Sequence, residues 1–136
     1  MNATIKKLME KRLNTVTPAI AVVFENMAYV PVLGTPYARC FFLPAPTGNP
    51  SYGGPPALKR EVGVMQVSLN YPPNAGAQNA LAQAKLIRDQ FARGLTLTEG
   101  LVRVLMDTHP YNGPGIPTTD WYMLPVSVPY TADVYE

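Results

Sequence analysis

Residues 60–73, REVGVMQVSLNYPP, constrain the fold more than any other stretch of this sequence. Apolar and polar residues alternate here with a period of two, which predicts a β-strand with one buried face. The predicted core face consists of Met65, Val67, Leu69 and Tyr71, and the opposite face of Val64, Gln66, Ser68 and Asn70. Two consecutive prolines then end the strand, because proline cannot continue a β ladder.

Two other segments have the spacing of amphipathic helices. The first covers residues 4–13, with Asn2 available as an N-cap and an apolar side of Ile5, Leu8, Met9 and Leu13. The second lies in AGAQNALAQAKLIRDQFARG, residues 75–94, where Asn74 can cap the start and Gly94 can terminate the end. Its expected core side consists of Ala80, Ala84, Ile87 and Phe91, with Leu81 extending the stripe.

Four further strands complete the predicted sheet. The apolar run AIAVVFEN, residues 19–26, predicts a strand buried on both faces. YARCFFL at 37–43 predicts a second strand, and residues 101–106 predict another, preceded by a bulge at Gly100. The last strand, in WYMLPVSVPY, carries Pro125 and Pro129 on the same face. Because proline cannot donate a hydrogen bond to a β ladder, this strand is expected to have an edge unpaired over part of its length or to be bulged.

The element order is therefore α-β-β-β-α-β-β, an α+β fold with two helices packed on a mostly antiparallel sheet. At 136 residues the chain fits a single domain, 1–136. A Pro/Gly-rich loop, PAPTGNPSYGGPPAL, occupies residues 44–58 and can maintain neither a helix nor a ladder. Loops of this length in a compact domain are usually functional or disordered.

Composition argues against several classes of function. The net charge is only +2, too small for a strong electrostatic footprint on nucleic acid. Charged residues make up 15%, against roughly 25% in ordinary soluble domains. A small domain with so little charge is expected to cover part of its surface with something other than water. The longest apolar run near the start is too short for a signal peptide core or a membrane span, and the single cysteine fits synthesis in a reducing cytosol.

Residues that could support catalysis are few. His109 is the only histidine and Cys40 the only cysteine, and no short ligand spacing accompanies either of them. The glycine in GPPALKR is followed by prolines, which lack the N–H donors of a phosphate-binding loop. We therefore expect no enzyme activity, no cofactor and no metal. A DNA-binding module using Lys59 and Arg60 is an alternative that salt-dependent duplex affinity would support.

A protein interface is favoured instead. Exposed tyrosine and tryptophan are typical of interfaces, and Tyr52, in the middle of the 44–58 loop, is the aromatic least expected in the core. The mixture of Val64 with Gln66 and Ser68 suits a protein contact, although a solvated sheet face with one valine is the alternative. The candidate subunit or tube interface comprises Tyr52, Lys59, Arg60, Val64, Gln66 and Ser68.

Several segments in this order resemble the tail terminator, or tail completion, proteins of long-tailed bacteriophages. They are FENMAYVP (24–31), TPYARCFFLPA (35–45), GVMQVSLNYPPNAG (63–76), FARG (91–94) and DWYMLPVSVPY (120–130). The resemblance spans residues 2–130 and implies a small α+β domain, in agreement with the order predicted above.

The resemblance also implies a non-enzymatic virion protein. Members of this family form a ring, typically of six subunits, on the head-proximal end of the tail tube, where they stop polymerisation and present a surface for the head. The implied partners are further copies of the chain, the tail tube protein and a head connector or completion protein, with genome DNA passing through the lumen without specific binding. The implied location is the head-tail junction of a virion assembled in the host cytoplasm. Another head-to-tail joining or minor tail protein is the alternative.

Overall fold

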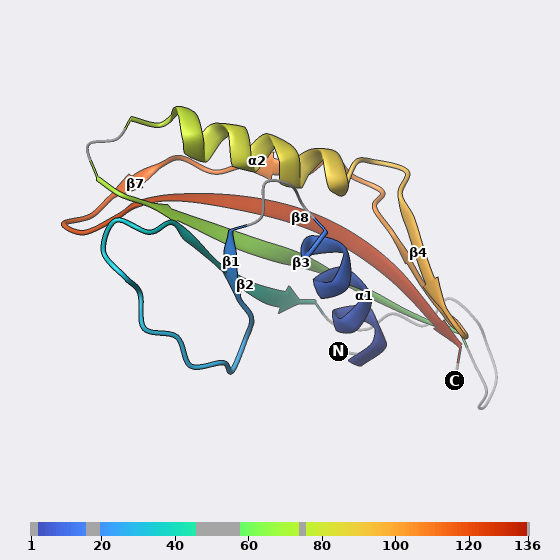
Figure 1. Cartoon of the computed structure of the whole chain (residues 1–136). Helices are drawn as coiled ribbons and strands as arrows, with labels where there is room; N and C mark the ends of the chain where they lie inside the picture. The colour runs from blue at the N-terminus through green and yellow to red at the C-terminus, as the bar shows by residue number, and fades with distance from the viewer. Residues whose placement is uncertain (1–2, 16–19, 46–57, 74–75, 136) are drawn as a thin grey trace.

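The structure, a computed structural model, describes residues 3–15, 20–45, 58–73 and 76–135. Ten elements follow one another in these ranges, and Figure 1 shows their arrangement. They are α1 (Ala3–Leu13), β1 (Ala21–Val23), β2 (Tyr37–Pro44), β3 (Leu58–Tyr71), α2 (Gln78–Gln90), β4 (Thr96–Glu99), β5 (Val102–Leu105), β6 (Tyr111–Asn112), β7 (Ile116–Pro117) and β8 (Tyr122–Tyr135).

One mixed sheet contains all the strands of the described chain. Its order is β1-β2-β3-β8-β5-β4, and the short strands β6 and β7 also pair with β8. Strands β3 and β8 pair antiparallel from Leu58↔Tyr135 to Tyr71↔Tyr122 and form the long curved centre of the sheet (Figure 1). Strand β1 runs parallel to β2, whereas the other pairs are antiparallel. The predicted α+β class with two helices on a mostly antiparallel sheet is confirmed.

Both helices pack on the same face of this sheet and share one apolar core. The predicted core face of β3, comprising Met65, Val67, Leu69 and Tyr71, is buried as expected. The core residues of the helices are also buried where predicted, and they include Ile5, Met9, Leu13, Ala80, Ala84, Ile87 and Phe91. Strands β3 and β8 are neighbours in the sheet, and along each strand the side chains alternate between the two faces. Every second side chain of both strands therefore points at the helices.

Two strand predictions were wrong in detail. Of the run 19–26, the described residues 20–26 give only the three-residue strand β1, whose Ala21 is exposed because the strand lies at the edge of the sheet rather than between two neighbours. Residues 96–105 form a hairpin of β4 and β5 instead of one strand. Gly100 is not a bulge but lies in the hairpin turn, with a φ of 59° that favours glycine. The loop that follows contains the short strands β6 and β7.

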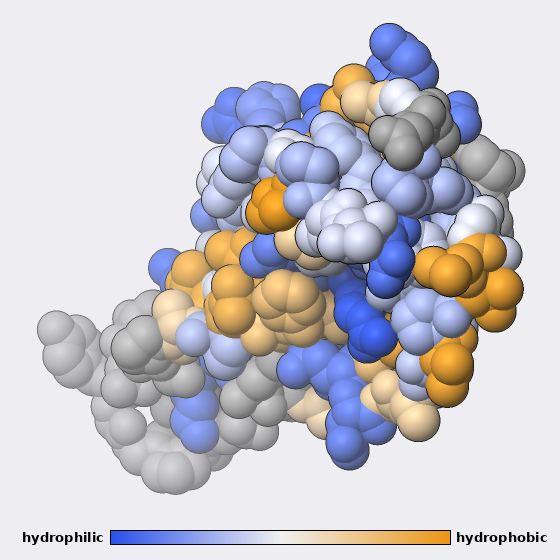
Figure 2. All heavy atoms as spheres, turned by 90° about the vertical axis from the view of Figure 1, so that its left-hand side faces the viewer, coloured by the Kyte–Doolittle hydropathy of each residue, from blue (hydrophilic) through white to orange (hydrophobic). Residues whose placement is uncertain are grey.

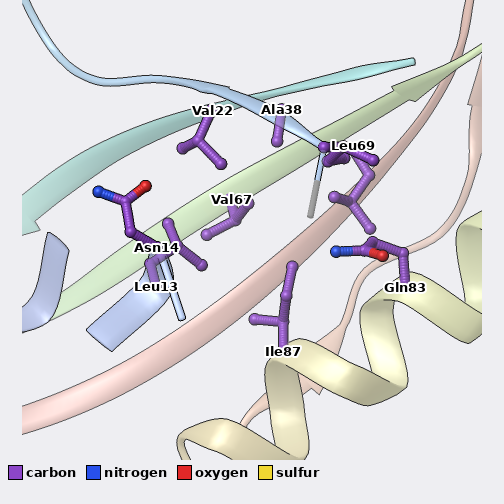
Figure 3. A pocket seen from close by; sticks show the side chains of 9 residues that line it. Leu13, Asn14, Val22, Ala38, Val67, Leu69, Gln83 and Ile87 are labelled. Carbon is purple, nitrogen blue, oxygen red and sulfur yellow. The ribbon is translucent and has the colours of Figure 1, made fainter. Parts of the chain in front are cut away.

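The helix α2 also departs from prediction in two respects. It ends at Gln90 with Phe91 as its C-cap, so Gly94 does not terminate it. Leu81 is 41% exposed, and Gln83 is buried in its place. Gln83 borders a cavity of about 50 Å³, with Asn14 at its other end and Val67 and Leu69 of β3 between them (Figure 3). The volume suits a few water molecules, whereas small-molecule sites measure roughly 300–1,000 Å³. The candidate caps Asn2 and Asn74 lie outside the described residues.

The two prolines of β8 sit where its second edge has gaps. On that side β7 pairs with residues 122–123, β6 with 126–127, and β5 with 131–134. Pro125 and Pro129 fall between these pairings, so neither interrupts a ladder on that edge. The prediction of an edge unpaired over part of its length is confirmed. The carbonyl of Pro125 is nevertheless satisfied, because it accepts a hydrogen bond of 2.8 Å from the N–H of Gly113.

Gly63 allows the long strands to pack closely, and this leads to a testable prediction. It lies opposite Tyr130 in the β3–β8 ladder, and a Cβ at this position would come within 2.7 Å of the Tyr130 hydroxyl oxygen. It would also meet the carbonyl oxygen of Leu43 at 2.9 Å, an atom that cannot move without distorting β2. Gly63→Ala is therefore expected to lower the free energy of unfolding by about 1–3 kcal/mol. Chemical denaturation would measure this, and an unchanged midpoint would contradict the close packing.

Candidate subunit interface

The sheet face opposite the helices carries a group of partly exposed apolar side chains. We call this surface the open face and define it by the apolar residues Phe41, Leu43, Val62, Val64, Leu105 and Pro129, together with the polar residue Gln66. The register aligns these residues across neighbouring strands, since Leu43 pairs with Val64 and Val64 pairs with Pro129. In the described part of the chain neither helix covers this face, because both pack on the core side.

The apolar content of the open face is high for a surface that meets only water. Leu43 is 51% exposed and Val62 is 42% exposed, and Phe41, Val64 and Leu105 are half-buried. Contiguous exposed apolar side chains on a soluble protein commonly mark a contact with another molecule. Seen from the side that carries β7 and the β1–β2 connection, hydrophobic residues gather in separate patches among hydrophilic ones (Figure 2).

A row of charges borders one end of the open face. The Nε of Arg60 donates a hydrogen bond of 2.9 Å to Asp133 Oδ1, and Arg103 is the residue opposite Asp133 on the other side. The Asp133 carboxylate raises the pKa of Arg60 through this bond. Two arginines thus flank one aspartate, and in the next row Asp107 accepts a hydrogen bond of 2.9 Å from the Thr131 hydroxyl, so charges of both signs border this end of the face. Exposed ion pairs add little stability, so the row is better suited to orienting a partner.

The candidate interface residues are only partly brought together. Val64 and Gln66 lie half-buried on the open face and Arg60 borders it, as the alternation predicted. Ser68 points to the same side but is only 6% exposed, because its small side chain lies in one cross-strand row between Arg39 and Pro125. Ser68 is therefore not available to a partner.

The remaining candidates are Lys59 and Tyr52. Lys59 and Arg60 belong to β3, which begins at Leu58. The alternation of β3 places Lys59 on the side of Met65, away from the open face. Tyr52 lies outside the described residues, as does most of the 44–58 loop.

The structure also places the residues that were considered for catalysis and metal binding. Within the described residues no group of three or more His, Cys, Asp or Glu side chains could hold a metal ion. His109 is exposed, and Cys40 is buried in the core next to Ala38 and Phe42 on β2. No helix among the described segments is long and apolar enough to cross a membrane.

The environment of Cys40 makes its thiol unreactive and gives a prediction for high pH. Burial, together with the nearby carboxylates of Glu10 and Glu25, raises the pKa of Cys40 from 9.0 to about 12. Between these values the folded state keeps a proton that the unfolded state loses, so stability falls as pH rises. The free energy of unfolding should drop by about 1.4 kcal/mol per pH unit above pH 9 from this group. Denaturation of wild type and Cys40→Ala at about pH 8 and pH 10, on either side of the ordinary thiol pKa, would measure it; equal slopes would contradict the prediction.

Comparison with known proteins assigns the chain to a family. The profile of the phage tail terminator protein family matches residues 4–130. The chain belongs to the phage tail terminator family. One solved structure is similar to this tail terminator, with a TM-score of 0.73 and 27% sequence identity, and the match covers 97% of this chain and 94% of the other. No curated protein matches this chain.

Membership gives the protein a structural role in a phage tail. The family is a structural, non-enzymatic one, and it places the terminator in the virion at the tail, in association with tail and head. The open face is thus a candidate surface for assembly rather than for catalysis.

Sequence reasoning missed part of this surface. Leu43 and Val62 are among its most exposed apolar residues, yet neither was a candidate. Val62 lies two residues before Val64 on β3, so continuing the same alternation toward Arg60 would have included it. Leu43 required the register between β2 and β3, which pairs it with Val64 and which no local pattern contains.

Proposed function

We propose that this tail terminator forms a ring, hexameric in keeping with its family, on the head-proximal end of the tail tube. The ring stops addition of further tube subunits and offers its other side to the head connector or completion protein. The match of the family profile to residues 4–130 carries this proposal. Termination requires geometry rather than chemistry, so the protein acts without a cofactor and is not an enzyme. Assembly takes place in the host cytoplasm.

The open face supports the proposal at the level of residues. A ring needs two different surfaces on each subunit, because side-to-side contacts between identical copies in a closed ring are heterologous. Val62, Val64 and Leu43 supply apolar contact area, and Arg60 with Arg103 supplies charge at its border. We assign this face, including Gln66, to contact with a neighbouring subunit or with the tube end. Tyr52 remains a candidate for the same role.

Growth stops in this account because the ring does not reproduce the next tube layer. One side of the ring is complementary to the tube end, while the other provides no template for a further tube subunit. A lumen of appropriate width lets DNA pass without specific binding.

Tube growth in vitro tests the proposal. Purified tail tube protein is allowed to elongate from short tube seeds, with and without this chain, and electron microscopy records the lengths. We expect the chain to bind one end of each tube and to arrest growth at that end. Binding to head connector proteins without any binding to tubes would instead favour the head-to-tail joining alternative. Growth at an unchanged rate with no end-bound density would refute termination.

A further inference from the structure

The connection between β1 and β2 is an exposed apolar segment that the assignment of the open face leaves unexplained. We call residues 26–35, NMAYVPVLGT, the arm. It runs out from the body of the molecule as a wide loop (Figure 1). Four of its apolar side chains are largely exposed, namely Met27 at 60%, Val30 at 85%, Val32 at 60% and Leu33 at 71%. Water alone gives no reason to gather four such residues in one segment.

The arm is held at its base and its middle. Glu25 Oε1 accepts hydrogen bonds from the backbone N–H of Phe42 at 3.1 Å and from Lys6 Nζ at 3.4 Å. The ring of Tyr29 packs on Tyr37 at 5.1 Å between centroids, and Tyr37 packs edge-on against Trp121 at the same distance. The position of the arm is thereby fixed relative to the sheet, which lowers the entropy that a contact would cost.

The backbone of the arm is open to a partner. Within the described chain, residues 27–31 make no hydrogen bond to other backbone groups, and the turn bond from Thr35 N–H to the Val32 carbonyl closes only the end of the arm. In an extended segment the N–H and C=O of Val30 and the N–H of Val32 point to one side, and in the described chain they have no backbone partner, whereas the Val32 carbonyl accepts the bond from Thr35. Pro31 lies between them with its nitrogen on the opposite side, so it does not interfere with pairing on theirs.

The opposite edge of the sheet has a matching site. Strand β4 is the last in the sheet order, with β5 on one side and no further strand on the other among the described residues. A groove of about 310 Å³ runs between β4 and α1, lined by Leu8, Lys11, Arg12, Thr15, Thr96, Leu97 and Thr98. Partly buried Leu8 and Leu97 give it an apolar floor, and two cations form its rim. An edge strand beside an apolar groove accepts an extended segment by β-strand addition.

We propose that the arm of one copy of this chain adds as a strand to β4 of the next copy. Val30 and Val32 then enter the groove between α1 and β4 and contact Leu8 and Leu97. The arm carries no cation and its nearest charge is Glu25, so the basic rim of Lys11 and Arg12 does not repel it. Within one chain the arm and β4 lie at opposite ends of the sheet, so each copy offers one of each (Figure 1). Repetition of this heterologous contact closes a ring. The inference rests on the proposed ring.

Cysteine cross-linking of the full chain tests the contact. In a Val32→Cys plus Leu97→Cys variant, mild oxidation should give a ladder of covalent multimers, with or without tail tubes present, because the proposed contact brings these two side chains together. Cys40 can remain, because burial raises its pKa to about 12 and keeps it out of the reaction. A Val32→Cys plus Leu81→Cys variant is the matched control and should give no ladder, since Leu81 lies on α2.

The outcomes separate the inference from the proposed function. Rings visible by electron microscopy without a ladder would overturn the contact while leaving the ring intact. Cross-links that join the thiol introduced at position 32 to the tail tube protein, instead of to the thiol introduced at position 97, would also overturn it. Failure to form rings or to bind tubes in any variant, wild type included, would overturn the proposed function and this inference together.

A pair of charge substitutions in the arm provides a second measurement. Val30→Asp plus Val32→Asp should reduce ring formation at least about tenfold, because both aspartates would have to enter the apolar groove. Leu81→Asp on α2 should leave ring formation unchanged. Equal ring formation by the two variants would count against the arm as a contact.

Discussion

Replacing Val67 by aspartate is expected to unfold the tail terminator. Val67 is fully buried at the centre of β3, between β2 and β8 and beneath the helices. An aspartate there would place a charge with no partner among apolar side chains, which costs several kcal/mol even when the pKa of the group shifts. Small domains have a total stability of about 5–15 kcal/mol, so the loss is comparable to the whole. Circular dichroism and the soluble yield would report it.

The control for this prediction lies three residues earlier on the same strand. Val64→Asp places the same charge on the open face, where Val64 is half-buried and meets no helix. We expect that variant to keep its fold, with a thermal transition within a few degrees of wild type. If Val67→Asp folded normally and Val64→Asp did not, the assignment of the two sheet faces would be reversed.

A double substitution on the open face should separate folding from assembly. Leu43→Asp plus Val62→Asp replaces two of its most exposed apolar residues, which lie in adjacent cross-strand rows. The subunit should remain folded, because both side chains already contact water. Association should fall by at least about a hundredfold, since two desolvated like charges at a contact cost several kcal/mol in binding.

The matched control for the open face is Leu81→Asp on α2. Leu81 is 41% exposed and Val62 is 42% exposed. Replacing either residue by aspartate therefore changes a side chain of similar exposure, on α2 in one case and on the open face in the other. Analytical ultracentrifugation and electron microscopy of tube ends would compare the variants. Normal ring formation and tube binding by the double variant would show that the open face is not an interface.

Much of the fold was predictable because its core follows local periodicity. The alternation in 60–73 predicted the buried face of β3, and the spacing in α2 predicted its packing side at Ala80, Ala84 and Ile87. These patterns need only the geometry of one element. By contrast, the exposure of Leu81 and the burial of Gln83 depend on where α2 lies over β3 and β8.

The parts that failed depend on contacts between distant segments. Residues 19–26 are apolar enough for a central strand, yet their position at the sheet edge reduces them to Ala21–Val23. Ser68 points outward as predicted but is covered by its row neighbours Arg39 and Pro125, whose identity follows only from the register. The candidate site was found in part for the same reason: parity identified Val64 and Gln66, whereas Leu43 required the pairing of β2 with β3.

The length of tails assembled without this protein tests the central claim most directly. Host cells would be infected with phage lacking a functional copy of this chain, and tail lengths would be measured by electron microscopy against wild-type phage. Termination by this protein predicts tail tubes that exceed the normal length and vary widely, together with heads that carry no tails. Tails of normal, uniform length would contradict the account.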